Sequence, residues 1–324
     1  MERANGLQVV VGAGGGTGRA IVDELLRQGR RVRAVTRGSA DGLMAGVEHV
    51  HADLYEPADV RRAMEGAAVV YHAAQPRYDQ WAGNFERLNA SVAGGAAAVG
   101  ARLVFADNLY LYGPGSSPMT EASPQRAVDR KGSLRRVLAA DLLERHARGE
   151  LEVAIGRSAD YFGPHGINSG TGERVFGAIA AGKTPAWAGR GDQPHSLSYL
   201  PDLARSMVML GDRDEAAGRA WHLPVVDPIT GRAFMERAAA AAGVPAKVRV
   251  DSALMLRVAG LFVPMAREVG VVMYQWTEPF VSDWSAFESA FGPFTRTPLD
   301  EALATTVAWW RERAVGGAEG RQAA

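Results

Sequence analysis

The sequence predicts an α/β protein with a doubly wound parallel sheet and a smaller lobe, mostly C-terminal. Strand-like and helix-like segments alternate through the first half, which is typical of parallel strands joined by crossover helices. Past residue 160 the alternation fades, and Gly- and Pro-containing loops appear at 163–172 and 182–194. We therefore expect a Rossmann-like domain over residues 1–160. Residues 161–324 would mainly form a substrate-binding lobe, with some segments returning to the first domain.

A strand, a glycine-rich turn and a helix stand near the N-terminus. Leu7 to Val11 is an apolar, β-branched run, typical of a strand buried on both faces. Five of the next seven residues are glycine, and apolar residues then recur at helical spacing from Ile21 to Leu26. Such a turn lets a pyrophosphate approach bare backbone, and the helix N-terminus supplies free N–H groups. These residues predict nucleotide binding.

The glycine spacing departs from the pattern G-x-G-x-x-G, because Thr17 or Arg19 stands where the third glycine would fall. Glycines recur instead at three-residue intervals, at Gly12, Gly15 and Gly18. A glycine turn alone also fits a flexible loop or another phosphate-binding unit, so the flanking strand and helix carry the prediction.

The later elements follow from the same patterns. Predicted strands are Gln8–Val11, Arg31–Thr36, Glu48–Ala52, Val69–His72, Arg102–Ala106 and Val153–Arg157. Predicted helices include Pro57–Met64, Ala82–Val99 and Ser133–Arg148. We expect Asp53 to cap the helical region at Pro57, and Ser133 to cap the helix that starts at Leu134.

Composition excludes several classes of function. Lys+Arg and Asp+Glu are balanced at 36 each, so no global charge indicates nucleic acid or an acidic membrane as partner. The chain has no cysteine, which excludes disulfides, thiol catalysis and cysteine-ligated metals. The apolar region 254–274 is interrupted by Arg257, Pro264, Arg267 and Glu268, and so predicts two packed helices rather than a membrane span. We expect a cytoplasmic protein without a bound metal.

Several short motifs follow the glycine turn. They are HADL at 51–54, YHAAQP at 71–76, Asn89, LVFADNLYLYGP at 103–114, IGRSADYFGP at 155–164, SYLPDLARSM at 198–207 and TPLDEAL at 297–303. In this order, with glycines at 12, 15 and 18, they resemble the extended short-chain dehydrogenase/reductase superfamily, the NAD-dependent epimerase/dehydratase class. The resemblance runs from about residue 7 to about residue 313 and implies a nicotinamide cofactor.

The resemblance also implies which residues hold that cofactor. The glycine turn would meet the pyrophosphate, Asp53 the adenine ring, and the YHAAQP segment would pass under the riboses. The implied cofactor residues are Gly12, Gly15, Gly16, Thr17, Gly18, Asp53, Leu54, Ala73, Ala74 and Gln75.

The second strand bears on the choice between NAD(H) and NADP(H). NAD-preferring members place an acidic residue about 20 positions after the glycine loop to bond the ribose hydroxyls. Thr36 and Arg37 occupy that place here, and Arg37 offers a charge-assisted, fork-shaped contact to a 2′-phosphate. Arg19 is a second candidate for this contact. We predict NADP(H); the alternative is that both arginines are surface residues.

The catalytic positions do not match the family pattern. The family carries a serine or threonine at the end of strand five and then a Tyr-x-x-x-Lys motif. Aligned on Tyr112–Gly113, those positions hold Asn108, Lys131 and Arg135. We predict that Asn108 polarises a carbonyl, that Arg135 binds ribose, and that Lys131 donates a proton once burial lowers its pKa.

Two alternatives to this catalytic set stay open. Tyr110 and Tyr112 are rival acids, because a loop at the strand end can aim one of them at the nicotinamide. Lys131 and Arg135 also fit a solvated helix face with no acid–base role.

Candidate substrate residues come mostly from the second half. Asp160 ends the sixth strand, His165 and His195 lie in loops, and Trp187, Tyr199, Tyr274 and Trp276 are aromatics suited to an apolar pocket wall. Each also has a structural alternative, as a loop cap, a surface histidine or a core aromatic. Together they predict a fairly apolar substrate rather than a nucleotide sugar, whose diphosphate would need more cations.

The sequence thus predicts an NADP(H)-dependent oxidoreductase acting on a carbonyl, alcohol or activated alkene of a small molecule. The alternative is a protein on the same fold without net redox turnover: an isomerase, dehydratase, cyclase or cofactor sensor. A homodimer through the helices at 82–99 and 133–148 is also expected from the resemblance.

Overall fold

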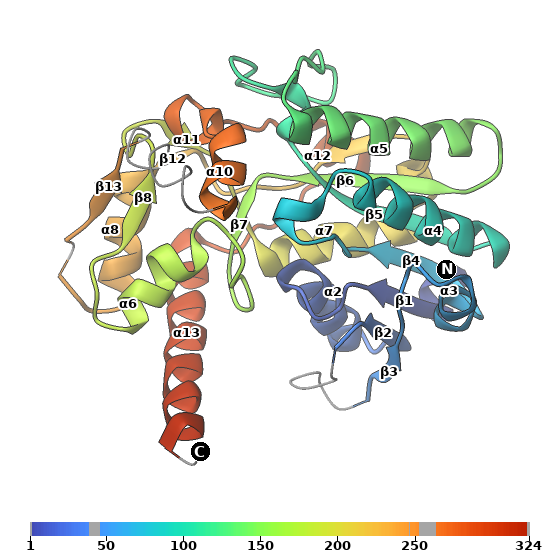
Figure 1. Cartoon of the computed structure of the whole chain (residues 1–324), viewed down its shortest axis with the longest axis horizontal. Coiled ribbons are helices and arrows are strands. Elements are labelled where there is room, and N and C mark those ends of the chain that lie inside the picture. Colours follow the sequence, from blue (N-terminus) through green and yellow to red (C-terminus); the bar gives the residue numbers. More distant parts are fainter. Residues whose placement is uncertain (1, 39–45, 246, 253–263, 323–324) are drawn as a thin grey trace.

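The computed structural model describes residues 2–38, 46–245, 247–252 and 264–322. Seven parallel strands form the central sheet in the order β11-β6-β5-β4-β1-β2-β3 (Figure 1). They are β1 (Leu7–Val11), β2 (Val32–Thr36), β3 (Glu48–His51), β4 (Ala67–His72), β5 (Arg102–Asn108), β6 (Val153–Ser158) and β11 (Ala220–His222). The predicted doubly wound parallel sheet is therefore confirmed, and its six predicted strands are all present.

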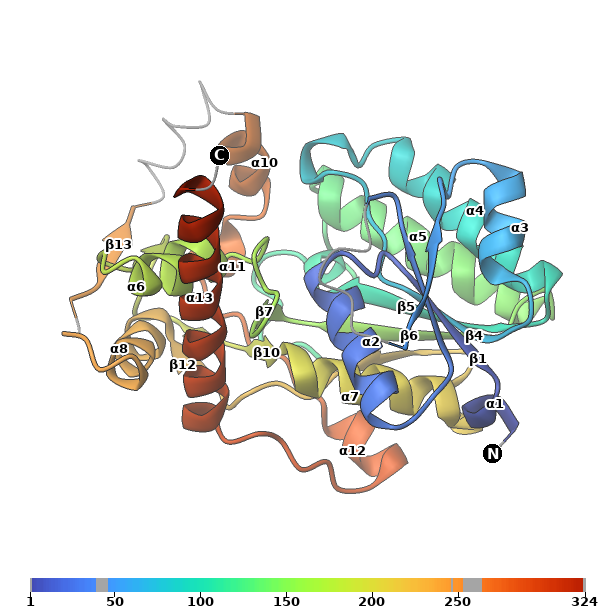
Figure 2. The same ribbon diagram turned by 90° about the horizontal axis from the view of Figure 1, so that it is seen from below.

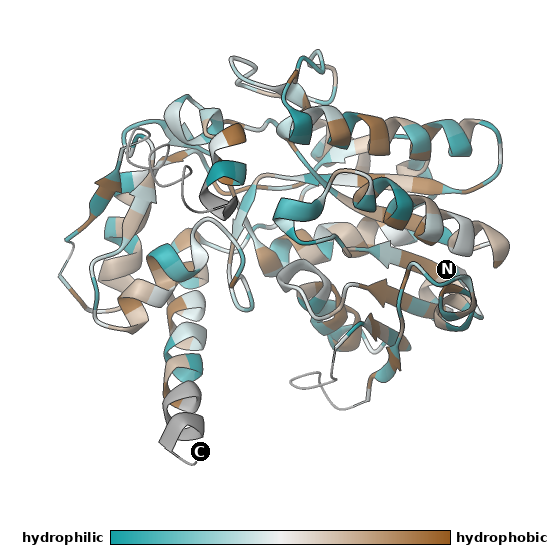
Figure 3. Ribbon diagram, in the orientation of Figure 1, coloured by the Kyte–Doolittle hydropathy of each residue, from teal (hydrophilic) through white to brown (hydrophobic). Residues whose placement is uncertain are grey.

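Helices cover both faces of this sheet, as Figure 2 shows. One face packs against α3 (Pro57–Met64), α4 (Asn84–Ala98) and α5 (Arg130–Ala147); the other packs against α2 (Gly16–Arg27), α7 (Leu200–Asp212) and α12 (Ser285–Phe291). Along β1, Val9 and Val11 face the first layer and Val10 the second. Because both faces are buried, β1 and β2 are largely hydrophobic (Figure 3).

A second group of elements forms the smaller lobe beside the sheet. It has its own aromatic core, to which Phe162, Phe176, Trp187, Phe234 and Trp310 contribute. Its elements are β7 (Asp160–Phe162), η3 (Gly172–Gly177), α6 (Ala178–Ala180), β8 (Ala186–Ala188), β9 (Pro194–His195), β10 (Leu197–Tyr199), β12 (Ile229–Thr230), α8 (Gly231–Ala241), β13 (Arg249–Asp251), α10 (Pro264–Val271), α11 (Tyr274–Thr277) and α13 (Leu299–Gln322). Short segments complete the fold: α1 (Glu2–Asn5), η1 (Tyr78–Gln80), η2 (Tyr110–Tyr112) and η4 (Asp214–Ala216).

The chain after residue 160 is shared between the two parts. β11 extends the central sheet beside β6, and α7 and α12 pack on its face. No helix within the described residues is long and apolar enough to cross a membrane. Of the apolar region 254–274, residues 254–263 lie outside the described part of the chain, and the rest contains α10 and part of α11.

The two predicted helix caps are wrong. Helix α5 begins three residues before Ser133, because the Asp129 carboxylate accepts hydrogen bonds from the backbone N–H groups of Lys131 and Gly132. Ser133 lies inside the helix and donates to the Ala127 carbonyl. The N-cap of α3 is Glu56, and the Asp53 side chain accepts from the Tyr55 N–H instead. At α5 an earlier acceptor thus takes the free N–H groups, whereas at Asp53 a nearer N–H group takes the acceptor.

Candidate functional site

The glycine turn between β1 and α2 leaves room only for backbone. Gly12 has a φ of +81°, and a Cβ there would lie 2.5 Å from the backbone nitrogen of Ala74. A Cβ on Gly18 would lie 2.2 Å from the Gly12 carbonyl oxygen, so this glycine lets α2 pack closely on β1. Gly15 is the N-cap of α2 and supplies no side chain to the first N–H groups. The turn and these free donors fit a pyrophosphate.

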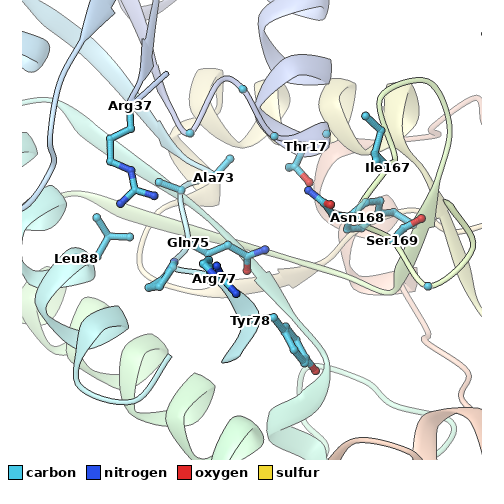
Figure 4. Close-up of a pocket in the computed structure, with 18 of the residues that line it drawn as sticks. Thr17, Arg37, Ala73, Gln75, Arg77, Tyr78, Leu88, Ile167, Asn168 and Ser169 are labelled. Atoms are coloured by element: carbon cyan, nitrogen blue, oxygen red, sulfur yellow. The ribbon is translucent and has the colours of Figure 1, made fainter. Parts of the chain in front are cut away.

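A cavity of about 1040 Å³ lies at the carboxyl ends of the parallel strands. Every predicted cofactor residue lines it except Gly18: Gly12, Gly15, Gly16, Thr17, Arg37, Asp53, Leu54, Ala73, Ala74 and Gln75. Figure 4 shows Arg37 and Leu88 toward one end of this cavity and Thr17, Asn168 and Ser169 toward the other. The cavity therefore has the extent and the backbone cradle that a dinucleotide requires.

The part of the cavity away from Arg37 is lined by residues of both lobes. Tyr78 and Tyr110 follow β4 and β5, whereas the other residues come from the second lobe: Asp160, Tyr161, Ile167, Asn168, Ser169, Gly170, Arg174, Ala188, Val269, Val272, Gln275 and Trp276. The end of β2 contacts the adenosine ribose in dinucleotide folds. The opposite part of the cavity is thus the place for the nicotinamide and a substrate.

Three tyrosines line this part of the cavity: Tyr78, Tyr110 and Tyr161. Burial raises the pKa of Tyr110 to about 12, and the Asp160 carboxylate adds to this rise, while hydrogen bonds with Gln275 and Tyr78 oppose it. Burial also raises the pKa of Tyr78, with Tyr110 and Asp160 acting in the same direction. Burial and the Asp160 carboxylate likewise raise the pKa of Tyr161 to about 12, so all three phenols are protonated near neutral pH and can donate hydrogen bonds.

Asp160 is held by a buried histidine. The Nε2 atom of His195 lies 2.9 Å from Oδ2 of Asp160. The His195 ring is stacked between Trp276 and Phe280, at centroid distances of 5.0 and 5.3 Å, and is 2% exposed. Asp160 lines the cavity and His195 does not. The pair therefore places a carboxylate at the cavity wall and fixes its orientation through the second lobe.

Lys131 lies outside the large cavity. Its Nζ donates to the Tyr78 carbonyl oxygen at 2.6 Å, lies 3.0 Å from Oε2 of Glu268, and stands 3.7 Å from the centroid of the Tyr78 ring. It lines a separate cavity of about 360 Å³ together with Glu268 and Trp81. Burial lowers the pKa of Lys131, and the Glu268 carboxylate opposes this shift. This placement ties η1, α5 and α10 together and gives a proton-donor role no support.

Arg135 reaches the cavity indirectly. Its guanidinium donates to Oε1 of Gln75 at 3.2 Å, and Gln75 lines the cavity. Its other partner is the buried Asp107 carboxylate at 3.4 Å, which also accepts from Nε of Arg157 at 3.2 Å. The Arg135 side chain is 5% exposed and lies over the rings of Trp81 and Phe85. Arg135 thus orients Gln75 from behind the cavity wall.

The other two predicted catalytic residues also lie behind the wall. Asn108 accepts a hydrogen bond from the backbone N–H of Tyr110 at 3.1 Å, so it shapes the turn that carries that tyrosine. The Tyr112 hydroxyl lies 2.6 Å from Nε2 of His222 and accepts from Arg157 at 2.9 Å. Neither residue is among those that line the large cavity. Of the two rival tyrosines, Tyr110 is the one at the cavity.

The predicted substrate residues divide in the same way. Asp160 and Trp276 line the cavity, whereas Trp187 and Tyr199 belong to the core of the second lobe. The His165 ring lies against Trp309, at a centroid distance of 4.8 Å, and is outside the cavity. Tyr274 donates to the Tyr110 carbonyl oxygen at 3.2 Å and supports the turn from outside.

Several polar cavity residues were not predicted from the sequence, among them Tyr78, Asn168, Arg174 and Gln275. Tyr78 has a sequence signal, because it comes two residues after the YHAAQP motif at the end of β4. The other three lie in loops and short helices of the second lobe, where no periodic pattern marks an inward-facing residue. Their placement depends on how that lobe packs against the sheet.

Comparisons with known proteins agree with this fold. The pattern of the NAD dependent epimerase/dehydratase family matches residues 8–223. A 66-residue stretch is 42% identical to the 2-alkyl-3-oxoalkanoate reductase of Shewanella oneidensis, a match that spans 20% of this chain and only 17% of that protein.

Solved structures extend the similarity to nearly the whole chain. The Bordetella bronchiseptica enzyme WbmH, solved with NAD+, has a TM-score of 0.74 at 19% identity over 95% of this chain and 99% of its own. The UDP-N-acetylglucosamine 4-epimerase of Methanobrevibacter ruminantium, solved with UDP-N-acetylmuramic acid, has a TM-score of 0.78 at 17% identity over the same shares. At these identities the likeness shows the fold. With the family match over most of the chain and a cavity built for a nicotinamide dinucleotide, this protein belongs to the NAD dependent epimerase/dehydratase family of NAD(P)-dependent enzymes.

Proposed function

We propose that the protein is an NADP(H)-dependent reductase of a carbonyl group in a small, largely apolar molecule, with Tyr110 as the proton donor. The observation that carries this proposal is geometric: Tyr110 comes just after β5, at the carboxyl edge of the sheet, and lines the cavity together with Asp160. The partial relative from Shewanella oneidensis is named as a reductase of an oxo compound, which agrees with this direction.

The chemistry follows from the protonation state of Tyr110. The glycine turn and the end of β4 would hold a dihydronicotinamide cofactor, which would provide the hydride for a substrate carbonyl carbon. Tyr110 hydrogen-bonds the carbonyl oxygen and gives it the phenolic proton as negative charge develops there. Tyr78, which hydrogen-bonds Tyr110, then lies in place to return a proton to it.

The role of Tyr110 is tested by Tyr110→Phe. We expect kcat for carbonyl reduction to fall by about 10²–10⁴-fold, the usual contribution of a positioned general acid. The dissociation constant for NADPH should stay within a few-fold of wild type, because the hydroxyl lies at the substrate end. A panel of ketones, aldehydes and enones with NADPH oxidation as readout gives kcat, and calorimetry gives the dissociation constant.

Lys131→Gln is the matched variant, because Lys131 was the rival donor and lies outside the cavity. It should change kcat by less than about threefold, although it removes the contact with Glu268. Loss of activity in Lys131→Gln with retention in Tyr110→Phe would contradict the assignment.

The preference for NADP(H) rests on the end of β2. Thr36 and Arg37 leave no carboxylate there, and the exposed Arg37 side chain lines the cavity (Figure 4). The similar structures that were solved with NAD+ or NAD favour NAD(H) instead. We expect NADPH to bind at least about tenfold more tightly than NADH in calorimetry, and Arg37→Gln to abolish most of the difference. Tighter binding of NADH by the wild-type protein would overturn the preference.

A second candidate is an isomerase without net redox turnover, because sugar-nucleotide epimerases are among the similar structures. The cavity gives this candidate less support: within the described lobe residues, Arg174 is the one cation that lines it, whereas the diphosphate of a sugar nucleotide carries at least two negative charges. Conversion of UDP-glucose with no change in nicotinamide absorbance would establish this candidate in place of the reductase.

A further inference from the structure

The substrate part of the cavity combines an apolar wall with one cation from the second lobe. Ile167, Ala188, Val269, Val272 and Trp276 supply apolar surface. Within the described part of the chain, the arginines that line the cavity are Arg37, Arg77 and Arg174. Arg37 lies at the adenosine end, and Arg77 is exposed and paired with Asp79 on its own loop. Arg174 is therefore the cation placed to meet a substrate rather than the cofactor.

The charge on Arg174 is only half neutralised. Its Nη2 atom donates to Oδ2 of Asp251 at 2.6 Å. The same carboxylate accepts from Nε and Nη2 of Arg249, at 2.8 and 3.4 Å. Two guanidinium groups therefore share one carboxylate, and the cluster carries one excess positive charge. Asp251 is 7% exposed and has a pKa lowered by its hydrogen bonds to Arg249 and Arg174 against the effect of burial, so it stays ionised.

The position of Arg174 is fixed by the fold around it. It lies in η3, a π-helical segment, and such segments are frequent at functional sites. The preceding Thr171 is fully buried and donates to the Tyr161 carbonyl oxygen at 3.0 Å. Asp251 lies opposite Ala188 in the β13–β8 pair, and Ala188 lines the cavity. The guanidinium is thus held at the wall by its Asp251 contact, with its side chain 37% exposed.

We propose that Arg174 binds a carboxylate of the substrate, so that the substrate is an oxo acid with an apolar body. This inference rests on the proposed reductase function and names its substrate class. A guanidinium with one edge held by Asp251 still offers N–H donors to a second carboxylate, and low polarity around it strengthens that contact. The Arg174–Asp251–Arg249 cluster has one excess positive charge, and the Asp160 carboxylate adds a negative charge to the same cavity wall. A substrate with one carboxylate, held at Arg174, therefore fits this cavity better than the diphosphate of a nucleotide sugar, which would bring at least two negative charges.

Binding of an unreactive ligand tests the subsite without turnover. Octanoate and its neutral counterpart octanamide are titrated by calorimetry into the protein saturated with NADPH, which occupies the Arg37 end. We expect octanoate to bind at least about tenfold more tightly than octanamide, as for a charge-assisted hydrogen bond. Arg174→Gln should abolish this difference.

Arg249→Gln is the matched control. It removes an equal charge from the same carboxylate, but Arg249 is exposed and lies outside the cavity. This variant loses the excess charge but keeps the Arg174 N–H donors at the wall, so it should keep a preference for octanoate that is smaller than in the wild type. The proposal would be overturned by any of three results: equal binding of the two ligands by the wild-type protein, an equal loss of the octanoate preference in both variants, or weaker NADPH binding in Arg174→Gln.

Turnover separates this inference from the reductase proposal. Oxo acids of several chain lengths, each paired with its methyl ester, are compared as substrates. We expect Arg174→Gln to raise KM about tenfold or more for the acids, with kcat and the esters little changed. Reduction of acids and esters at equal efficiency by wild type overturns the subsite alone. Binding of octanoate that depends on Arg174, with no carbonyl reduced, supports the subsite and overturns the reductase.

Discussion

At the residue scale, the buried histidine His72 makes the stability of the protein depend on pH. It ends β4, is fully buried beside Phe105, and neither ring nitrogen has a hydrogen-bond partner within the described residues. Burial lowers the pKa of His72 to about 3, and the nearby Arg135 adds to this effect. The ring is therefore neutral in the folded protein at any pH at which the enzyme would work. A neutral ring is also what its position between sheet and α4 requires.

This burial predicts a loss of stability in acid. Because the pKa of His72 is lower in the folded state than in the unfolded state, only the unfolded chain takes up its proton as the pH falls below about 6.5. The free energy of unfolding should therefore fall by up to about 1.4 kcal/mol per pH unit from this group, between roughly pH 6.5 and pH 3. Burial lowers the pKa of His222 to about 3 as well, so it contributes in the same direction.

Urea denaturation at several pH values measures this effect. His72→Leu should reduce the pH dependence of the unfolding free energy by about one proton. Phe105→Leu, which alters the same packing without removing a titratable group, should lower stability equally at each pH. An unchanged slope in His72→Leu would show that His72 is not buried in its neutral form.

At the scale of elements, the ends of β5 and β6 and the start of α5 are joined by one carboxylate. Asp107 is fully buried and pairs with Arg135 of α5 and Arg157 of β6, whose side chains are 5% and 3% exposed. Arg157 continues the network to the Tyr112 hydroxyl, which meets His222 of β11. The network lies directly behind Gln75 and the Tyr110 turn. It thus connects cavity residues to three strands.

We predict that Asp107→Asn lowers the unfolding free energy by about 3–5 kcal/mol, because two buried guanidinium groups then lose their shared counter-charge. Glu150→Gln is the comparison, since Glu150 pairs with Arg148 at the surface and its loss should leave the unfolding free energy nearly unchanged. Denaturation in guanidinium chloride gives both values. Similar small losses in the two variants would contradict the network's role.

Contacts with α10 and η1 hold the Lys131 side chain away from the large cavity. It stands in the first turn of α5, one residue after Arg130, and both cations contact Glu268 of α10. The Lys131 ammonium lies over the Tyr78 and Trp81 rings at 3.7 and 4.4 Å. These contacts draw the side chain toward α10 and η1. The position at which the family has its catalytic tyrosine therefore serves to hold the cavity wall in this chain.

At the scale of the whole molecule, the homodimer stays a prediction, and we propose it through α4 and α5. Both helices cover the same face of the central sheet (Figure 2), and Val137 of α5 is 54% exposed. Light scattering after gel filtration should give about twice the 34.5 kDa of the chain. Val137→Glu should shift the mass toward the monomer. A monomeric wild-type protein would contradict this.

Much of the fold could be predicted because it depends on local patterns. The segments Leu7–Val11 and Val32–Thr36 are short and rich in β-branched residues, which indicates buried strands. The glycines from 12 to 18 mark the turn between β1 and α2. Helix caps were less predictable: Asp129, not Ser133, caps α5, because the first acceptor with access to the free N–H groups takes them.

By itself the sequence determined the parallel sheet, six of its seven strands and most of the cofactor wall, since each depends on residues close together in the chain. Which side chains meet the substrate was decided only by the tertiary structure. Tyr110 faces the cavity and Tyr112, two residues later, does not. Arg174 and Asp251 meet from segments far apart in the chain. The physical reason is that long-range packing aims side chains in irregular segments, where no periodicity encodes their direction.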